Sequence, residues 1–262
     1  MNNTNPLVSV IMNCNNGEKY LDQSLKSLKN QTYENWELIF FDNNSTDTSL
    51  SILKKENDHR IKIFTIKKLS NLYRARNLAI EKAKGKYLSF LDVDDLWEQD
   101  KLKTQVDFLE RNNNYKFSYS NYFVKQESDN RKFLRFKKNL KSGNITQDLL
   151  NNYSIGILTV LLEKEFFKEF LFEDRYNIIG DFDLFLKISR YHQIAYIDKP
   201  LATYRVHNNN YSSVNLEKYI SEYNHWFESN ENKYKNDNYS LFFQRFYLIK
   251  LKIKLFFKKL GV

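Results

Sequence analysis

Short apolar segments alternate with amphipathic segments through the first third of this chain. The apolar segments cover residues 7–12, 37–41, 60–66 and 86–91. The amphipathic segments carry Leu or Ala at helical spacing and cover residues 18–30, 71–83 and a stretch that begins at 45. Apolar runs this short are typical of strands buried on both faces of a parallel sheet. The alternation therefore predicts an α/β fold with a doubly wound, mostly parallel sheet flanked by helices.

The composition limits the class of protein. The chain has 262 residues, of which 42% are hydrophobic, enough for one sizeable α/β domain with a C-terminal appendage. Only two Pro and six Gly argue against a disordered or linker-rich chain. A single cysteine, Cys14, and no recognisable signal peptide predict a reducing cytoplasm. The net charge of +9 suits anionic partners such as nucleotides, acidic glycans, nucleic acid or a membrane surface.

Three carboxylates follow the fourth predicted strand, at Asp92, Asp94 and Asp95. Crowded carboxylates repel one another unless a cation joins them, and hard divalent ions commonly bridge carboxylates to substrate phosphates. The alternative is a plain turn, with Asp94 or Asp95 capping a helix that begins at Leu96. Open α/β sheets bind ligands outside the carboxyl ends of their strands, so the position favours a metal and phosphate site.

The turn after the first strand, residues 13–17, holds one glycine, which disfavours a dinucleotide-binding Rossmann domain. The sequence also lacks the Gly-x-x-x-x-Gly-Lys-Ser/Thr loop of P-loop ATPases. A bound diphosphate would therefore need a cation held on side chains. We expect ligand groups to gather after the first, second and fourth strands, at Asn13, Asn15, Asp42, Asp92 and Asp94.

Eight short motifs follow one another along residues 6–213. They are VSVI at 8–11, NGEKYL at 16–21, NQTY at 30–33, DNNSTD at 42–47, ARN at 75–77, FLDVDDLW at 90–97, DFDL at 181–184 and YRVH at 204–207. Each is weak alone, but in this order they resemble a family 2 glycosyltransferase of the GT-A fold. The resemblance implies transfer of a sugar from a nucleotide-diphosphate donor, with inversion, to a glycan or lipid-linked glycan in bacterial lipopolysaccharide or capsule biosynthesis.

The resemblance also assigns residues to the donor. Asp42 matches the carboxylate that accepts a hydrogen bond from the base, which favours a UDP-sugar, and Arg76 matches an arginine near the nucleotide. Asp92 and Val93 belong to the Asp-x-Asp motif and are assigned to the donor. Relatives often carry Pro-x-Tyr where this chain has Asn13-Cys14-Asn15, so Asn13 and Asn15 are expected to hydrogen-bond rather than stack.

The resemblance assigns metal binding and catalysis to three further residues. Asp94 and His207 match the positions that hold Mn²⁺ or Mg²⁺ against the diphosphate, and an imidazole ligand tilts the choice toward manganese. Asp181 matches the general base that deprotonates the acceptor. The alternative for Asp181 is a helix cap, with Asp183 on the solvent side.

We predict a GT-A domain over residues 1–213, with a nucleotide-binding half at 1–110 and an acceptor half at 111–213, and a helical tail at 214–262. Residues 241–260 carry six Lys or Arg and no acidic residue. Helical spacing would align Phe246, Ile249, Ile253, Phe256 and Leu260, although residues 249–255 also alternate like a strand. Such a helix could contact the inner face of an anionic membrane or simply dock on the domain.

Two other functions stay open. A sugar-1-phosphate nucleotidyltransferase shares a related sheet, but usually has a Gly-rich, Arg-containing loop where this chain has residues 13–17. A non-catalytic protein that binds nucleic acid or another anionic polymer would suit the charge, but it leaves the strand-end carboxylates unexplained. We therefore expect no nucleic-acid partner. Contacts that select the sugar and the acceptor are expected within residues 116–178.

Overall fold

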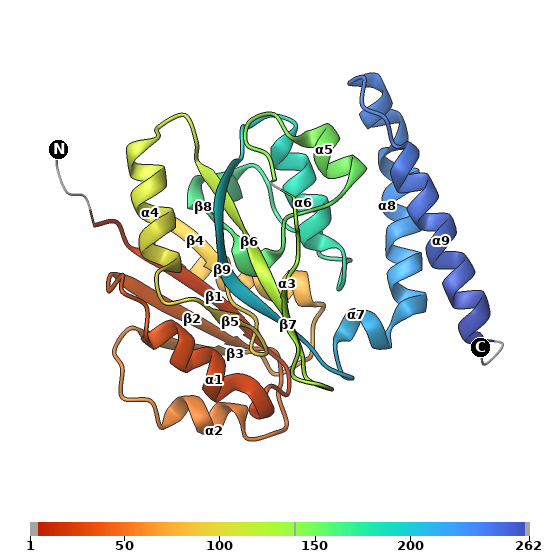
Figure 1. The fold of residues 1–262 in the computed structure, drawn as a ribbon. Helices are drawn as coiled ribbons and strands as arrows, with labels where there is room; N and C mark the ends of the chain where they lie inside the picture. The colour runs from red at the N-terminus through yellow and green to blue at the C-terminus, as the bar shows by residue number, and fades with distance from the viewer. Residues whose placement is uncertain (1–4, 139, 260–262) are drawn as a thin grey trace.

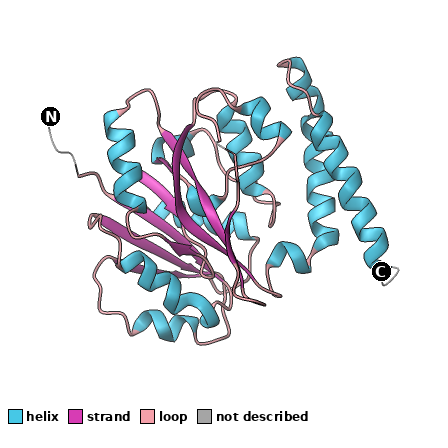
Figure 2. Cartoon of the chain, viewed as in Figure 1, coloured by secondary structure: helices cyan, strands magenta, loops and turns pink. Residues whose placement is uncertain are grey.

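The computed structural model describes residues 5–138 and 140–259. Its centre is a single sheet (Figures 1 and 2). The strands are β1 (Val8–Cys14), β2 (Trp36–Asp42), β3 (Ile61–Thr65), β4 (Tyr87–Phe90), β5 (Leu96–Trp97), β6 (Phe117–Gln126), β7 (Lys132–Leu134), β8 (Leu161–Glu163) and β9 (Ala195–Val206). Their order across the sheet is β3-β2-β1-β4-β8-β6-β9-β5, with β7 paired to β6.

The sheet is mostly parallel, as predicted. Strands β3, β2, β1 and β4 pair in parallel, and so do β6 and β9. The short strand β8 runs antiparallel between β4 and β6, while β5 and β7 are antiparallel edge pieces on β9 and β6. Because β1, β2 and β4 end at the same edge, the polar residues that follow them come close together.

Helices cover both faces of the sheet (Figure 1). They are α1 (Glu18–Lys29), α2 (Ser49–Lys54), α3 (Leu72–Lys82), α4 (Lys101–Arg111), α5 (Thr146–Asn151), α6 (Gly180–Ser189), α7 (Tyr211–Val214), α8 (Leu216–Asn236) and α9 (Phe242–Lys259). Short 3₁₀ helices span Ile157–Thr159 and Lys164–Lys168. Side chains alternate along each strand. Val10 of β1 thus packs in the core under α1, α2 and α4, while Ile11 packs in the core under α3, α5 and α6.

The predicted helix start at Leu96 is wrong. Leu96 and Trp97 form β5, which pairs with Thr203 and Ala202 of β9, and the next helix begins at Lys101. Neither Asp94 nor Asp95 therefore caps a helix at this point. Strand β7 pairs antiparallel with residues 123–125 of β6 and forms a hairpin with it.

The tail forms a helix rather than a strand. Helices α8 and α9 lie together along one flank of the domain, on the side away from the N-terminus in Figure 1. Buried residues of both helices, including Trp226 and Leu248, extend the core that lies under α5 and α6. Leu260, the last member of the predicted stripe, lies outside the described residues. Among the described residues, no helix combines the length and the apolar character needed to cross a bilayer.

Candidate active site

Hydrogen bonds to its main chain hold the acidic loop that follows β4. The Ser24 hydroxyl of α1 donates to the carbonyl oxygens of Val93, at 2.8 Å, and Asp95, at 2.5 Å. From the opposite side, Nε of Arg205 in β9 donates to the carbonyl oxygen of Asp94 at 2.8 Å. The backbone N–H of Arg205 donates to the Asp95 carboxylate at 3.0 Å. These hydrogen bonds fix the loop between α1 and β9.

The three carboxylates of this loop have different partners. Asp92 accepts a hydrogen bond from the Arg76 guanidinium of α3 at 2.5 Å, and the Arg76 side chain is buried. Asp94 lies 3.0 Å from Nε2 of His207. Asp95 is buried and bound to the backbone of β9, so its role is to hold the loop. Arg76 with Asp92 and Asp94 with His207 are therefore the two predicted groups that the fold brings together.

The surroundings of the Asp94–His207 pair shift the pKa of the Asp94 carboxyl and fix the position of the His207 ring. Burial raises the pKa of Asp94, the nearby charge of Asp92 raises it further, and His207 opposes both. The His207 ring packs against Tyr20, with ring centroids 4.8 Å apart. Its Nδ1 accepts a hydrogen bond from the Asn209 backbone at 3.2 Å, and its Nε2 lies 3.0 Å from an Asp94 carboxylate oxygen.

These residues fit a Mn²⁺ or Mg²⁺ ion that is shared with a diphosphate. Over the described part of the chain, no group of three His, Cys, Asp or Glu side chains could hold an ion alone. Mg²⁺ is usually bound through one or two carboxylates, with phosphate oxygens and water completing its coordination. Asp94 offers one such carboxylate, and the His207 imidazole lies 3.0 Å from it. His207 would bind such an ion through Nε2 in the tautomer that carries its hydrogen on Nδ1, and that tautomer would open the contact with Asn209.

The residues predicted after β1 and β2 differ in how they are engaged. Asn13 is buried, and neither polar atom of its side chain has a hydrogen-bond partner among the described residues. Asn15 instead donates to the carbonyl oxygen of Asn43 at 3.0 Å, and Asp42 accepts from the backbone of Ser45. A buried amide without partners is costly, so Asn13 is the least satisfied member of this group.

Asp181 lies in the first turn of α6 and is joined to the acidic loop through α3. It accepts a hydrogen bond from the Tyr73 hydroxyl at 2.9 Å. The guanidinium of Arg76, which pairs with Asp92, lies 4.9 Å from the centroid of the Tyr73 ring. Burial raises the pKa of Asp181, while Arg76 and the Tyr73 hydrogen bond oppose the increase. A carboxylate with a raised pKa is a better proton acceptor near neutral pH.

The helix-cap alternative for Asp181 does not describe this turn. The residue that caps α6 is Ile179, with no side-chain hydrogen bond, and the Asp181 carboxylate is turned to Tyr73. Asp183 is not on the solvent side: it is 1% exposed and pairs with Lys187 one turn later, at 2.6 Å. This face of α6 packs against an apolar core, so the buried Asp183 carboxylate needs the Lys187 partner.

A cavity of about 560 Å³ opens beside Asp181. Its walls are rich in aromatic side chains, and they come from β6, the segment 151–156, β9, α8 and α9. The tyrosines among them are Tyr122, Tyr153, Tyr204, Tyr219, Tyr223 and Tyr247. Part of this wall lies within the predicted acceptor-selecting region 116–178, but Tyr204 and the residues of α8 and α9 lie beyond it.

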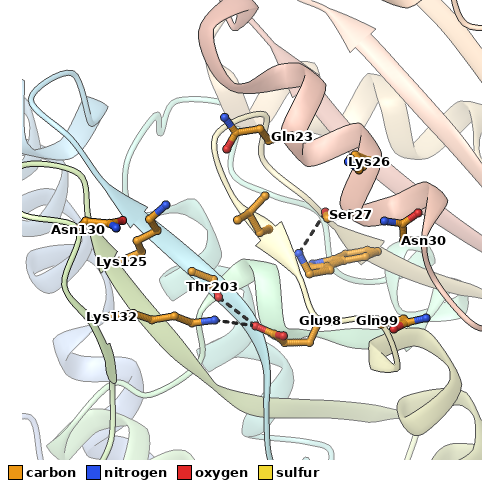
Figure 3. Close-up of a pocket in the computed structure, with 12 residues that line it drawn as sticks. Gln23, Lys26, Ser27, Asn30, Glu98, Gln99, Lys125, Asn130, Lys132 and Thr203 are labelled. Atoms are coloured by element: carbon orange, nitrogen blue, oxygen red, sulfur yellow. Dashed lines mark hydrogen bonds and ion pairs between the residues drawn. The ribbon is translucent and has the colours of Figure 1, made fainter.

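A second cavity, of about 710 Å³, lies between α1, β5 and the β6–β7 hairpin (Figure 3). Among its described lining residues there is none of the predicted donor or catalytic residues. Its charges are partly neutralised, because Glu98 accepts from Lys132 and from the Thr203 hydroxyl, each at 3.2 Å. This cavity therefore does not bring the predicted site residues together, whereas the other is lined by Asp181.

Four residues that shape the site were not predicted: Ser24, Tyr73, Asp95 in its structural role, and Arg205. Periodicity could have found two of them. Tyr73 precedes Arg76 by three helical positions and so lies on the same face of α3. Arg205 precedes His207 by two positions at the end of β9, which points both toward the acidic loop. Nothing local indicates Ser24, whose partners are about 70 residues away.

Comparison with known proteins identifies the family. Residues 9–168 match the sequence model of Glycosyl transferase family 2. The Escherichia coli protein WfgD, named UDP-Glc:alpha-D-GlcNAc-diphosphoundecaprenol beta-1,3-glucosyltransferase, is 37% identical over 168 residues, which cover 63% of this chain and 64% of WfgD. An uncharacterized glycosyltransferase of Haemophilus influenzae is 39% identical over 166 residues, covering 62% of this chain and 64% of the relative. The chain thus spans slightly less than two thirds of each relative's length.

Solved structures share the architecture. TarS residues 1–349 from S. aureus, in complex with UDP-GlcNAc, align with a TM-score of 0.66 and 18% identity, over 84% of this chain and 65% of that one. The mannosyltransferase PcManGT from Pyrobaculum calidifontis, in complex with GDP-Man and Mn²⁺, aligns with a TM-score of 0.64 and 16% identity, over 87% and 65%. Such distant likeness shows the fold alone, and the predicted GT-A fold is confirmed. Because the family match covers more than half of the chain, the protein belongs to glycosyl transferase family 2.

Proposed function

We propose that this chain is an inverting, divalent-metal-dependent glycosyltransferase that moves a sugar from a UDP-sugar to a glycan or lipid-linked glycan acceptor. One observation carries the proposal. The carboxylate at the Asp181 cavity is joined through Tyr73 and Arg76 to Asp92, within the loop that also presents Asp94. A proton acceptor for one substrate and a diphosphate site for the other are thus parts of one connected group of residues.

In the proposed reaction, an acceptor hydroxyl in the Asp181 cavity gives its proton to the Asp181 carboxylate. The hydroxyl oxygen bonds to the anomeric carbon of the donor sugar from the face opposite the diphosphate. The bond between that carbon and the diphosphate oxygen breaks, and the electron pair leaves with the nucleoside diphosphate. A divalent ion held by Asp94 and His207 would supply the positive charge that stabilises this leaving group.

The donor would be held by the ends of β1, β2 and β4. Asn13 offers an amide with no other partner among the described residues. Asp42 would accept from the base, and Arg76, held against Asp92, would place a fixed positive charge near the phosphates. Asn15 and Val93 would contact the donor from the flanking loops. WfgD, whose name specifies UDP-Glc, supports uridine, and PcManGT, solved with GDP-Man and Mn²⁺, supports a metal at such a site.

The acceptor would enter from the aromatic side of the cavity. The name of WfgD specifies a GlcNAc-diphosphoundecaprenol acceptor, which supports a lipid-linked glycan here as well. We therefore propose a role in assembly of a bacterial surface glycan, by a cytoplasmic enzyme that works at the inner face of the cell membrane.

The test is Asp181→Asn. A thermal-shift screen of nucleotide sugars, with and without Mn²⁺, first identifies the donor. The variant should then keep its donor-induced stabilisation but lose turnover by about 10²- to 10⁴-fold, the usual contribution of a positioned base. Asp148→Asn, at an exposed aspartate of α5, is the matched control and should leave turnover unchanged. Near-normal turnover by the Asp181 variant would show that another group takes the proton. Release of pyrophosphate from a nucleotide and a sugar 1-phosphate would identify a nucleotidyltransferase instead.

A further inference from the structure

Helix α9 has two apolar faces, and only one of them is buried. Leu248 and Leu251 pack into the domain core. A second stripe, spaced by three or four residues, lies on the opposite side of the helix and faces solvent. It consists of Phe242 (69% exposed), Phe246 (61%), Ile249 (50%), Ile253 (52%) and Phe256 (60%). We call these five residues the α9 stripe.

Cations border the α9 stripe along both edges, and the helix carries no acidic residue. On the edge next to α8, Arg245 pairs with Glu231 and Lys259 pairs with Glu217. On the other edge, Lys250 and Lys254 have no carboxylate of a described residue within ion-pair distance.

The α9 stripe leads directly to the cavity beside Asp181. Phe246 belongs to the stripe and also lines that cavity, together with Phe243, Tyr247 and Lys250 of the same helix. The outer wall of the proposed acceptor site and the exposed face of α9 are therefore one continuous surface.

We propose that α9 docks on an anionic lipid bilayer, with the α9 stripe at the boundary between headgroups and acyl chains and the lysines on lipid phosphates. An apolar stripe between cationic edges is the arrangement by which interfacial helices bind such membranes. A second copy of the chain suits this surface poorly. A two-fold contact sets the same patch against itself and would bring the unpaired lysines together.

The docked helix would open the Asp181 cavity at the membrane surface, where a lipid-linked acceptor is found. The acceptor role of this cavity rests on the proposed function. The docking itself does not, because it needs neither donor nor turnover. Failure to bind vesicles would leave the transferase reaction untouched, and an inactive enzyme that binds vesicles would leave the docking untouched.

The experiment is co-sedimentation of the full chain with vesicles of phosphatidylcholine alone or mixed with phosphatidylglycerol. We expect binding to the anionic vesicles only, and weaker binding as salt is raised. Ile253→Ser with Phe256→Ser should reduce that binding at least tenfold. Leu69→Ser with Leu171→Ser removes two apolar residues, each 56% exposed elsewhere on the surface, and should bind like the wild type. Equal losses in both double variants, or binding to neutral vesicles alone, would overturn the proposal.

A charge variant and a mass measurement complete the test. Lys254→Glu with Lys258→Glu should reduce binding to anionic vesicles while turnover on a soluble acceptor is unchanged, since neither residue lines the Asp181 cavity. Sedimentation velocity should give a monomer. A dimer that dissociates in the Ile253 and Phe256 variant, without vesicle binding by the wild type, would assign the α9 stripe to self-association instead.

Discussion

Replacing Tyr73 with Phe tests the link between α3 and the proposed base. The substitution removes one hydroxyl, which donates to Asp181 at 2.9 Å, and keeps the ring. The ring contacts with Phe172, at 5.0 Å between centroids, and with the Arg76 guanidinium can therefore persist. Burial keeps the pKa of Tyr73 well above its ordinary value, so the hydroxyl is a donor at any pH of interest.

The size of the effect follows from the preference of that hydrogen bond for the charged carboxylate. A hydrogen bond to a charged group contributes about 1.5–3 kcal/mol and one to a neutral group about 0.5–1.5 kcal/mol, a difference of about 1–1.5 kcal/mol. Because one pKa unit corresponds to about 1.4 kcal/mol, losing the bond should raise the pKa of Asp181 by about one unit. This adds to the increase that burial already causes.

The assay is the pH profile of kcat/KM, measured as release of the nucleoside diphosphate. A base works only when it is unprotonated, so activity falls as the pH drops through the pKa of Asp181. The acidic limb of the variant should lie about one pH unit above that of the wild type. Tyr196→Phe is the control, because its hydroxyl also donates to an aspartate at 2.9 Å, Asp198, and neither residue lines the Asp181 cavity. An acidic limb that stays in place or moves to lower pH would refute the reasoning.

Two more substitutions probe the same site. Asp94→Asn should raise the melting temperature of the metal-free protein at neutral pH. The pKa of Asp94 is raised in the folded state. Its carboxyl therefore favours folding at low pH, and this contribution is lost as the pH rises through the folded pKa. The same variant should lose stabilisation by Mn²⁺ in a thermal-shift titration; a lower melting temperature or a retained Mn²⁺ response would contradict this. Gly180→Ala would place a Cβ 2.4–2.6 Å from three carbons of the Tyr73 ring, so the ring must move. Urea unfolding should show a loss of about 1–3 kcal/mol, typical of overpacking, and an unchanged midpoint would show that the ring adjusts freely.

Local patterns were enough to predict most of the fold. The strands β1 to β4 and the helices α1, α2 and α3 follow from apolar runs and helical spacing that each segment carries in itself. The two-residue strand β5 does not, because Leu96 and Trp97 become a strand only by pairing with residues of β9 about 100 positions later. A helix was predicted there because nothing nearby in the sequence records that partner.

The same distinction holds at the site. The strand-end carboxylates were visible as a cluster. The sequence did not show that Asp95 is hydrogen-bonded to the backbone of β9 or that Asp92 forms an ion pair with Arg76. The roles of Asp94, His207 and Asp181 in binding and catalysis stay predictions. The helical stripe of α9 was recognised from its spacing, whereas its exposure depends on Leu248 and Leu251 occupying the core instead.

Strand β9 positions residues of both the Asp181 cavity and the acidic loop. Tyr204 lines the cavity beside Asp181, Arg205 holds the acidic loop, and His207 reaches Asp94 just past the end of the strand. A shift of one residue in its pairing with β6 would misplace all three at once. The segment 151–156 borders the cavity without belonging to a strand. We therefore expect relatives that use other acceptors to differ in sequence in this segment and to keep β9 unchanged.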